Sequence, residues 1–319
     1  MDLFALGTPV VDVFAKADDK LLKSLGAKKG ATAYFSAKRV EQIEKKLKKR
    51  LIYRYAGDNA RNVCEGFAAL GGFCGFQGAV GDDEDASYFA ANLQECSISG
   101  FLQRKKGSTG KIIALITPDR ERTFIADLGV STKCTRKLGV AAKKSRMFFV
   151  GSTTLSGKRD VARLAIEYME IFKKGKKKVA ISLENPPMVA KDRKMLLSIV
   201  KKYADVLFLN EDEAKAFLGK NYEKKLLNLK PKIPIFLKKG KSGSQVMLRG
   251  RKFSVSALKT NAADTTGAGD AYAAGTLYAM SRGYSVLSCA KMGSYLASKV
   301  VQKIGAGVPM RHTRMKVRL

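Results

Sequence analysis

Short apolar runs alternate with amphipathic stretches over the second half of the chain. The apolar runs are short enough for buried strands, and the stretches between them carry apolar residues at helical spacing. Strands are expected at 147–150, 178–183, 206–209 and 233–237, and helices at 158–172 and 188–203. This alternation is typical of a parallel sheet that helices cover on both faces. The pattern therefore predicts an α/β fold.

The first half of the chain interrupts this rhythm with short, partly aromatic segments. A buried strand at 3–12 and another at 73–80 fit the main sheet, whereas the other segments predict a small accessory sheet. Its elements are expected at 30–35, 51–55 and, as a hairpin, 111–117 with 122–126, with a helix at 37–49. We interpret these as a lid on a single domain of 1–319, with lid segments near 13–36, 50–56 and 100–126.

The remaining elements complete one domain without an internal repeat. Helices are expected at 63–70 and 85–95, an antiparallel strand pair at 244–248 and 252–257, and closing helices at 268–282 and 285–303. No convincing interdomain linker separates them.

Charge is the unusual feature of the composition. Sixty Lys and Arg residues against 28 Asp and Glu give a net charge of +32. Such an excess attracts polyanions, but the lysines are spread along the chain with few aromatics among them, so a solvated surface is the favoured interpretation. Nucleic acid as a partner stays open as the alternative.

Several classes of protein fit the sequence poorly. No segment approaches the roughly 20 apolar residues of a membrane span, and an acid, Asp2, stands where a signal peptide carries positive charge, so we expect a cytoplasmic protein. Five widely spaced cysteines without a C-x-x-C argue against zinc and a disulfide framework. The only histidine, His312, makes a Ser-His-Asp mechanism improbable.

The segment 263–271, Ala-Asp-Thr-Thr-Gly-Ala-Gly-Asp-Ala, carries the clearest chemistry. A glycine-rich turn that opens a helix binds anions, because its N–H groups and the helix dipole both favour negative charge. Asp270 would repel a bound anion, but it can act as a base beside one and take a proton from a hydroxyl that attacks phosphorus. The alternative, a helix with an acidic first turn and no catalysis, is less favoured for the whole segment.

Three other polar clusters follow predicted strands or open helices. Asp12 and the stretch 57–62, Gly-Asp-Asn-Ala-Arg-Asn, can hold substrate hydroxyls, although a turn aspartate and a helix cap are the alternatives. Asn210 and Glu213 can face Mg²⁺ or can form a capping box, which we favour slightly from these residues alone. The basic glycine loop 238–244 can approach a phosphate or can be a hairpin turn.

The residues that carry these features resemble a known family. Asp264-Thr-Thr-Gly-Ala-Gly-Asp270 looks like the C-terminal signature of the ribokinase or PfkB-type carbohydrate kinases, Gly57 to Asn62 like their substrate signature, and Asn210-x-x-Glu213 like their magnesium motif. The resemblance covers nearly the whole chain and is greatest to the adenosine-kinase-like, nucleoside-kinase branch. It implies a ribokinase-like three-layer α/β/α sandwich with a small β-sheet lid.

The same resemblance implies an activity and roles for residues. It implies ATP-dependent phosphorylation of a hydroxymethyl group on a nucleoside or sugar, with a sugar kinase of the same family as the alternative. Asp270 would be the base, and the amides of Gly267, Ala268 and Gly269 would hold the phosphoryl group. The resemblance also assigns Asp12, Gly57, Asp58 and Asn62 to the acceptor, Lys238, Gly240, Gly243 and Thr265 to the nucleotide, Asn210 and Glu213 to Mg²⁺, and Asp264–Thr265 to a monovalent cation such as K⁺.

The chain departs from the family pattern at three places. Asp58 stands where a second glycine is usual, Lys238 where a threonine is common, and the strand around Ile181–Glu184 lacks an Asp-x-Asn-x-Arg pattern. The first departure puts the acceptor's identity in doubt, and the third favours an unphosphorylated acceptor or a nucleoside. Tyr34, Phe35 and Tyr53 are candidates for a wall against a base, and Leu51 to Tyr55 for a homodimer contact through the lid.

Overall fold

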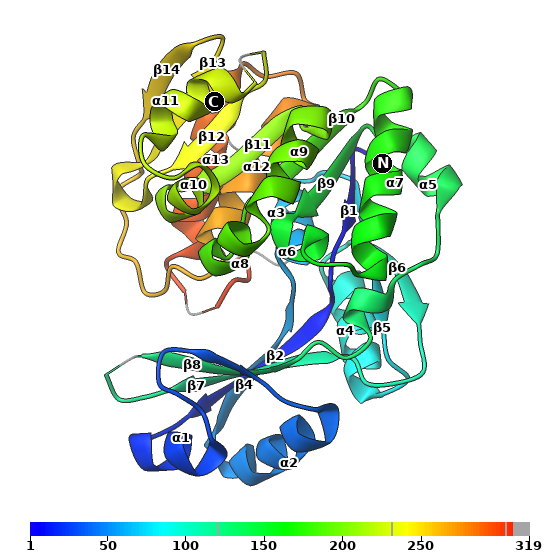
Figure 1. The fold of residues 1–319 in the computed structure, drawn as a ribbon, viewed down its shortest axis with the longest axis vertical. Helices are drawn as coiled ribbons and strands as arrows, with labels where there is room; N and C mark the ends of the chain where they lie inside the picture. Colours follow the sequence, from blue (N-terminus) through cyan, green and yellow to red (C-terminus); the bar gives the residue numbers. More distant parts are fainter. Residues whose placement is uncertain (120, 231, 304, 309–319) are drawn as a thin grey trace.

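A large sheet forms the centre of the molecule. The computed structural model describes residues 1–119, 121–230, 232–303 and 305–308. Within them, the large sheet has nine strands in the order β14-β13-β12-β11-β10-β9-β1-β5-β6 (Figure 1). These are β1 Leu3–Leu6, β5 Cys74–Val80, β6 Ser99–Arg104, β9 Met147–Gly151, β10 Lys178–Ser182, β11 Val206–Asn210, β12 Ile235–Lys238, β13 Ser244–Leu248 and β14 Arg251–Val255. The strands from β6 to β12 run parallel, and β13 and β14 are antiparallel.

Helices cover both faces of this sheet. Alternate residues of β1 show why: Leu3 and Ala5 pack into one apolar core, and Phe4 and Leu6 into another. The first core lies under α3 Asn59–Ala69, α4 Glu84–Glu95, α12 Ala268–Ser281 and α13 Val286–Val300. The other side carries α5 Gly139–Lys144, α6 Ser152–Leu155, α7 Asp160–Lys174, α8 Pro186–Lys191, α9 Arg193–Tyr203, α10 Glu211–Leu218 and α11 Tyr222–Leu229. The predicted α/β/α sandwich is confirmed.

A smaller sheet forms the lid. It has the strand order β3-β8-β7-β2-β4, with β2 Val10–Lys16, β3 Thr32–Tyr34, β4 Leu51–Gly57, β7 Gly110–Ile116 and β8 Arg122–Asp127. Its helices, α1 Asp19–Leu25 and α2 Ala37–Leu47, cover the face that points away from the large sheet (Figure 1). Val13, Ile43 and Leu115 are fully buried between them. The other face of the lid therefore looks toward the large sheet.

Several predicted elements are divided or shifted in the structure. The strand expected at 3–12 is two strands in different sheets, because β1 ends before Gly7 and Pro9 has no N–H for a ladder. The segment 99–104, partly assigned to the lid, pairs with β5 in the large sheet instead. It was missed because its half-exposed residues carry no apolar run.

Two helices also differ from their predicted bounds. The expected helix 188–203 is divided between α8 and α9 at Asp192. The helix expected from Val63 begins at Asn59 instead, because Asp58 caps it. This earlier start places Asn62 inside the first turn of α3 and not in a loop before it.

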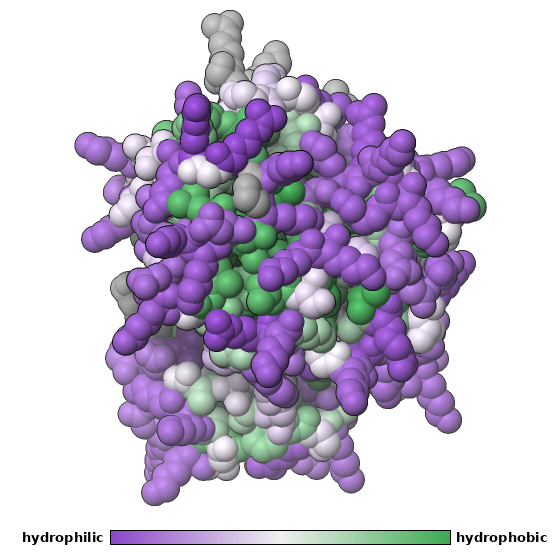
Figure 2. All heavy atoms as spheres, turned by 45° about the horizontal axis from the view of Figure 1, so that its top comes forward, coloured by the Kyte–Doolittle hydropathy of each residue, from purple (hydrophilic) through white to green (hydrophobic). Residues whose placement is uncertain are grey.

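The surface is hydrophilic over the face seen in Figure 2, with apolar atoms in small areas between the polar side chains. The polar side chains are spread over this face and do not form a single stripe, which agrees with a solvated surface. Among the described residues, the helices are too short or too polar to cross a membrane. His312 lies outside the described residues.

Candidate active site

The carboxyl ends of the parallel strands meet at one edge of the large sheet. Neighbouring strand ends are in register there, with Gly151 beside Ser182 and Asn210 beside Lys238. Loops that follow these strands therefore share one edge, where ligands of α/β proteins bind.

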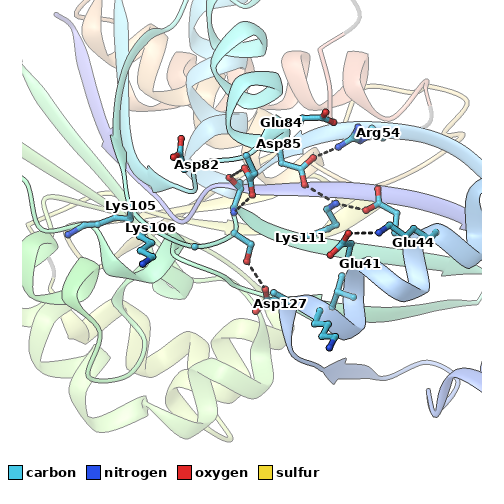
Figure 3. A pocket seen from close by; sticks show the side chains of 18 of the residues that line it. Glu41, Glu44, Arg54, Asp82, Glu84, Asp85, Lys105, Lys106, Lys111 and Asp127 are labelled. Carbon is cyan, nitrogen blue, oxygen red and sulfur yellow. Dashed lines mark hydrogen bonds and ion pairs between the residues drawn. The ribbon is translucent and has the colours of Figure 1, made fainter.

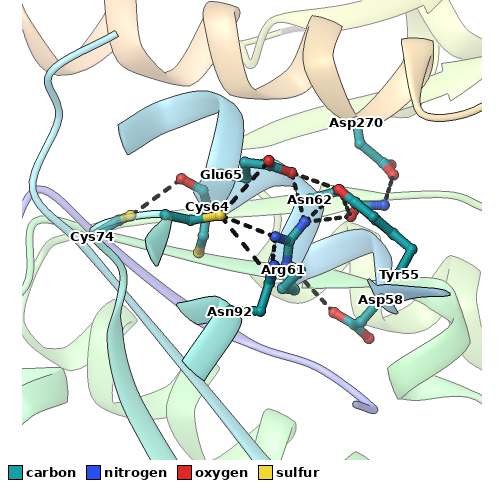
Figure 4. A network of polar contacts seen from close by, with 10 residues as sticks. Tyr55, Asp58, Arg61, Asn62, Cys64, Glu65, Cys74, Asn92 and Asp270 are labelled. Carbon is teal, nitrogen blue, oxygen red and sulfur yellow. Dashed lines mark hydrogen bonds and ion pairs between the residues drawn. The ribbon is translucent and has the colours of Figure 1, made fainter. Parts of the chain in front are cut away.

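Asp270 lies in the first turn of α12, which begins after Gly267. Gly267 has a φ of 76°, and a side chain there would lie within 2.6 Å of Ala306 Cβ, so the turn requires glycine. One carboxylate oxygen of Asp270 accepts an N–H from Asn62 Nδ2 of α3 at 3.0 Å (Figure 4). The other accepts an N–H from Asn59 Nδ2 of the same helix at 3.3 Å. Residues more than 200 positions apart in the sequence thus fix one carboxylate.

Burial raises the pKa of Asp270 to about 6, although the hydrogen bond from Asn62 and the positive charge of Lys238 lower it. This pKa suits a general base, because the carboxylate is charged at neutral pH yet more basic than an ordinary aspartate. The geometry and the pKa agree with the predicted role, which stays a prediction.

The turn before Asp270 has donors for an anion. The first N–H groups of a helix have no acceptor within the helix, but that of Ala268 donates to the carbonyl of Thr265 at 3.2 Å. The amide predicted at Ala268 is therefore already engaged, and that of Gly269 is the better candidate. A side chain at Gly269 would meet Lys238 Nζ at 3.0 Å, so this ammonium group lies directly beside the turn.

Asp12 and Gly57 lie on the lid strands β2 and β4. A side chain at Gly57 would come within 2.0 Å of Asp12 Oδ2, so only glycine leaves room for this carboxyl group. Burial and the charge of Asp58 raise the pKa of Asp12 to about 7. Within the described residues, the Asp12 carboxyl forms no hydrogen bond or ion pair, so it is available to a ligand hydroxyl.

Asp58, by contrast, is occupied by its own chain. It caps α3 by accepting the N–H of Arg61 at 2.9 Å, and it also accepts the N–H of Thr8 at 2.7 Å. These contacts account for the aspartate at this position without a ligand. Its predicted contact with an acceptor stays a prediction.

A buried network behind Asn62 was not predicted from the sequence. Arg61 is fully buried, and its guanidinium donates to Glu65 Oε2 at 2.6 Å, to Asn62 Oδ1 at 3.2 Å and to Asn92 (Figure 4). Because the oxygen of the Asn62 amide faces Arg61, its nitrogen faces Asp270. In the sequence, Arg61 stands three residues after Asp58 and four residues before Glu65, which could have suggested such a network. The sequence does not show, however, which way the arginine side chain points.

Asn210 and Glu213 form the capping box that we favoured slightly. The Glu213 N–H donates to Asn210 Oδ1 at 2.8 Å, and both Glu213 oxygens accept from Asn210, at 2.6 Å and 2.8 Å. The described residues contain no cluster of three or more His, Cys, Asp or Glu side chains that fits a metal ion. The predicted contact of Asn210 and Glu213 with Mg²⁺ stays a prediction.

The two glycines of the predicted nucleotide loop, Gly240 and Gly243, differ in the space around them. Gly240 has a φ of 54° with open space around it, whereas a side chain at Gly243 would collide with the carbonyl of Val255 at 2.1 Å. Gly243 is thus explained by strand packing, and only Gly240 is open to a ligand. Thr265 is exposed.

Glu184, at the same edge, is a second buried acid that the sequence analysis did not select. Its Oε2 accepts the hydroxyl of Thr153 at 2.8 Å, and its Oε1 is buried without a partner among the described residues. Burial and the charge of Asp270 raise the pKa of Glu184 well above its ordinary value. Burial therefore favours the uncharged form of Glu184 more than in an ordinary glutamate.

A family model matches most of this chain. Residues 24–313 match the model described as pfkB family carbohydrate kinase. The chain belongs to the pfkB family. It is therefore an enzyme, a phosphotransferase with an alcohol group as acceptor, as the sequence analysis predicted.

Relatives within the pfkB family carry different names. An adenosine kinase of Saccharomyces cerevisiae is 25% identical over 335 residues, covering 96% of each chain. A 5-dehydro-2-deoxygluconokinase of Listeria innocua is 28% identical over 269 residues, covering 78% of this chain and 82% of its own. The crystal structure of an adenosine kinase from Sinorhizobium meliloti superimposes with a TM-score of 0.86 at 25% identity, covering 97% of this chain and 96% of its own.

Proposed function

We propose that this kinase transfers the γ-phosphoryl group of ATP to a hydroxymethyl group of an adenosine-like nucleoside or of a sugar. The observation that carries the proposal is Asp270. It is a carboxylate with a pKa of about 6, held by Asn59 and Asn62 beside an anion-binding turn and Lys238. A base next to a phosphate site is what attack of a hydroxyl on phosphorus requires.

In this mechanism Asp12 accepts a hydrogen bond from the acceptor and holds its reactive hydroxyl near Asp270. Asp270 takes the hydroxyl proton while the oxygen attacks the γ-phosphorus, and ADP leaves. The N–H of Gly269 and the ammonium of Lys238 stabilise charge on the phosphoryl oxygens. Mg²⁺ bound to the nucleotide would neutralise phosphate charge, with Asn210 and Glu213 ordering its water ligands.

The lid favours a nucleoside over a sugar. Asp12 shares its face of the lid with Phe14 and Tyr53, whose rings stack at a centroid distance of 4.2 Å, and with Phe124 across the neighbouring strands. Such an apolar face suits a heterocyclic base. Of the other predicted wall residues, Phe35 packs into the lid's own core, and Tyr34 is 63% exposed. A sugar kinase is the alternative within the family.

Two further proposals concern partners. The exposed residues Leu51 and Ile52 lie on β4, an edge strand of the lid, which can pair with a second copy in a homodimer. The charge of +32 is also compatible with a second function as a polyanion-binding protein, the alternative to a solvated surface. Loss of RNA binding at about 0.1 M salt would remove this second function.

A screen of ATP consumption over nucleosides and sugars tests the kinase proposal. We expect turnover with a nucleoside that bears a free hydroxymethyl group, and none with its 5′-deoxy analogue. Turnover with sugars alone would establish the alternative. If ATP consumption stayed at the background rate with every acceptor, the proposal would fail.

A further inference from the structure

One oxygen of the buried carboxyl group of Glu184 has no partner. Glu184 is 5% exposed and stands two residues after β10, at the edge of the large sheet where the candidate active site lies. Its N–H donates to the hydroxyl of Ser152 at 2.8 Å, and its Oε2 accepts the hydroxyl of Thr153 at 2.8 Å. Its Oε1 is buried without a hydrogen-bond partner among the described residues. Because a buried polar atom without a partner costs free energy, this oxygen indicates a place for a donor from a ligand.

Two glycines at neighbouring strand ends leave room for carboxyl groups at this place. β1 and β9 are neighbouring parallel strands, and Gly7 and Gly151 stand at their carboxyl ends. A side chain at Gly151 would collide with both carboxyl oxygens of Glu184, and a side chain at Gly7 would collide with the carboxyl group of Asp58. Neighbouring strands lie about 4.8 Å apart. The carboxyl groups of Asp58 and Glu184 therefore lie over adjacent strand ends.

The electrostatic potential at Glu184 is negative. Burial is the main cause of the raised pKa of Glu184, and the negative charge of Asp270 is the next. The charges of Asp58 and Glu213 raise this pKa further. The inside of the site is thus acidic, although the whole chain has a net charge of +32. An anion beside Oε1 would meet the same charges that disfavour ionisation of Glu184 itself.

These observations restrict the chemistry of a ligand at Glu184. A phosphate or carboxylate group is disfavoured there by the surrounding acids. A hydroxyl or amino group is favoured, because it can donate a hydrogen bond to Oε1. A metal ion is the weaker candidate, because the described residues contain no cluster of three or more His, Cys, Asp or Glu side chains that fits one.

Glu184 lies close to the residues proposed to bind and activate the acceptor. The charge of Asp58 raises the pKa of Asp12, of Asp270 and of Glu184, so Asp58 is near all three. The proposed function gives the acceptor to Asp12 and its reactive hydroxyl to Asp270. The phosphates of the nucleotide are anions, which the acids around Glu184 disfavour. The acceptor is therefore the ligand whose donor group suits Oε1.

A cavity of about 1440 Å³, which α2, α4 and lid strands line, differs from this place because its charges are paired (Figure 3). Arg54 and Lys111 both pair with Asp85, Lys111 at 2.8 Å, and Lys111 also pairs with Glu44. Because these acids and bases neutralise each other, they do not indicate a ligand. The unpartnered oxygen of Glu184 does.

We propose that Glu184 is a second anchor for the acceptor and selects acceptors that carry a hydroxyl or amino donor and no anionic group. This inference rests on the proposed function, because it assigns the acceptor as the ligand of Glu184. Asp12 holds one donor of the acceptor from the lid, and Glu184 holds another from the large sheet. The two carboxyl groups orient the acceptor while Asp270 takes the proton of its hydroxymethyl group. An acceptor with phosphate or carboxylate in place of the donor would face Glu184 and its acidic neighbours.

The first experiment measures turnover of an acceptor found by the screen and of its analogues. One hydroxyl group at a time, other than that of the hydroxymethyl group, is replaced by an amino group or by a phosphate. For adenosine these are the 2′- and 3′-amino-deoxy analogues and the 2′- and 3′-monophosphates, and for a sugar the corresponding amino sugars and sugar phosphates. We expect one amino analogue to have a wild-type kcat/KM at least equal to that of the parent. The matching phosphate should be about 10²-fold or more below the parent.

Two variants of Glu184 test its contact with the acceptor. Glu184→Gln keeps the size of the side chain and an oxygen for the Thr153 hydroxyl, but it cannot become charged. It should lower kcat/KM for the amino analogue by about tenfold or more and that for the parent by less than about threefold. Glu184→Ala should raise the KM for the parent by about tenfold and leave the KM for ATP near its wild-type value. The matched control is Glu167→Gln, which removes a 49% exposed carboxylate 2.9 Å from Lys137 and should change none of these constants.

The outcomes separate a contact with the acceptor from a structural role. A misfolded variant would lose the parent and the amino analogue alike, so equal losses for both in Glu184→Gln would overturn the inference. A KM for ATP that rises as much as the KM for the acceptor in Glu184→Ala would also overturn it. So would a wild type that phosphorylates every phosphate-bearing analogue as fast as the parent.

The second experiment measures binding without ATP. The unfolding midpoint is compared without ligand, with adenosine, with its amino analogues and with MgCl₂. In the wild type we expect adenosine and one amino analogue to raise the midpoint, and in Glu184→Gln the shift with the amino analogue should be smaller. A midpoint that rises with Mg²⁺ in the wild type but not in Glu184→Gln would identify a metal ligand and overturn the inference, and so would shifts that do not depend on Glu184 or are absent with every analogue. Binding that depends on Glu184 without any ATP consumption would refute the proposed function and leave the anchor supported.

Discussion

Replacing Asp270 by asparagine is expected to lower turnover by at least about 10²-fold and to stabilise the fold. Burial raises the pKa of Asp270 from 3.8 to about 6. One pKa unit corresponds to about 1.4 kcal/mol, so keeping this charge in the folded protein costs about 3 kcal/mol at neutral pH. Asparagine keeps the size of the side chain and can still accept one N–H from Asn59 or Asn62. The variant should therefore gain up to this amount in free energy of unfolding.

The stability gained by Asp270→Asn is expected to depend on pH. The folded-state pKa of Asp270 lies above the unfolded value, so its contribution to stability is fully present below pH 3.8 and is lost as the pH rises through about 6. The advantage of Asp270→Asn should thus be largest above pH 7 and vanish near pH 4. For a chain of this size about 2 °C corresponds to 1 kcal/mol, so the unfolding midpoint at pH 8 should rise by up to about 6 °C.

The assay combines thermal unfolding from pH 4 to pH 8 with the rate of phosphoryl transfer, which should fall by at least about 10²-fold. Asp82→Asn is the control, because it removes a carboxylate that is 84% exposed and lies 3.6 Å from Arg104. It should change neither quantity appreciably. A lower unfolding midpoint for Asp270→Asn at pH 8 would refute the electrostatic reasoning, and retained activity would refute the role as base.

Two other substitutions probe the partners of Asp270. Asp12→Asn should raise the KM for the acceptor by about tenfold or more, because Asp12 is proposed to bind the acceptor. The KM for ATP should stay near the wild-type value. Equal changes of both constants in steady-state kinetics would contradict this prediction. Lys238→Met should weaken ATP binding, which calorimetry measures. It should also move the acid limb of the pH–rate profile to higher pH, because Lys238 lowers the pKa of Asp270. An acid limb at the wild-type pH would contradict the proximity of the two charges.

Much of the fold could be predicted because the second half of the chain repeats one local pattern. Buried parallel strands such as β9 and β10 are continuous apolar runs, and helices such as α7 have clear periodicity. The edge strand β6 could not be found in this way, since half-exposed strands carry mixed residues. The division of 3–12 into β1 and β2 also escaped, because the apolar character continues on both sides of Pro9 while the strand changes sheets.

Residues of the candidate site could be predicted only where neighbouring residues in the sequence indicate their function. Asp270 stands in a turn whose glycines are visible in the sequence. Arg61 and Arg122 both contact residues far away in the chain, Asn92 at 31 positions and Asp264 at 142 positions. The sequence does not show which of the 60 basic residues make such distant contacts. Asp58 shows the reverse: its position in the motif predicts a ligand contact, whereas its hydrogen bonds with Thr8 and Arg61 indicate a cap.

The measurement that tests the central claim most directly is the pH dependence of kcat/KM for phosphoryl transfer by Asp12→Asn. This variant removes Asp12, whose pKa of about 7 would otherwise overlap with that of Asp270. A limb near pH 6 is then assigned to Asp270. The account predicts a rate that rises about tenfold per pH unit up to an apparent pKa near 6 and is constant above it. A rate independent of pH between 5 and 8 would contradict the assignment of Asp270 as the base.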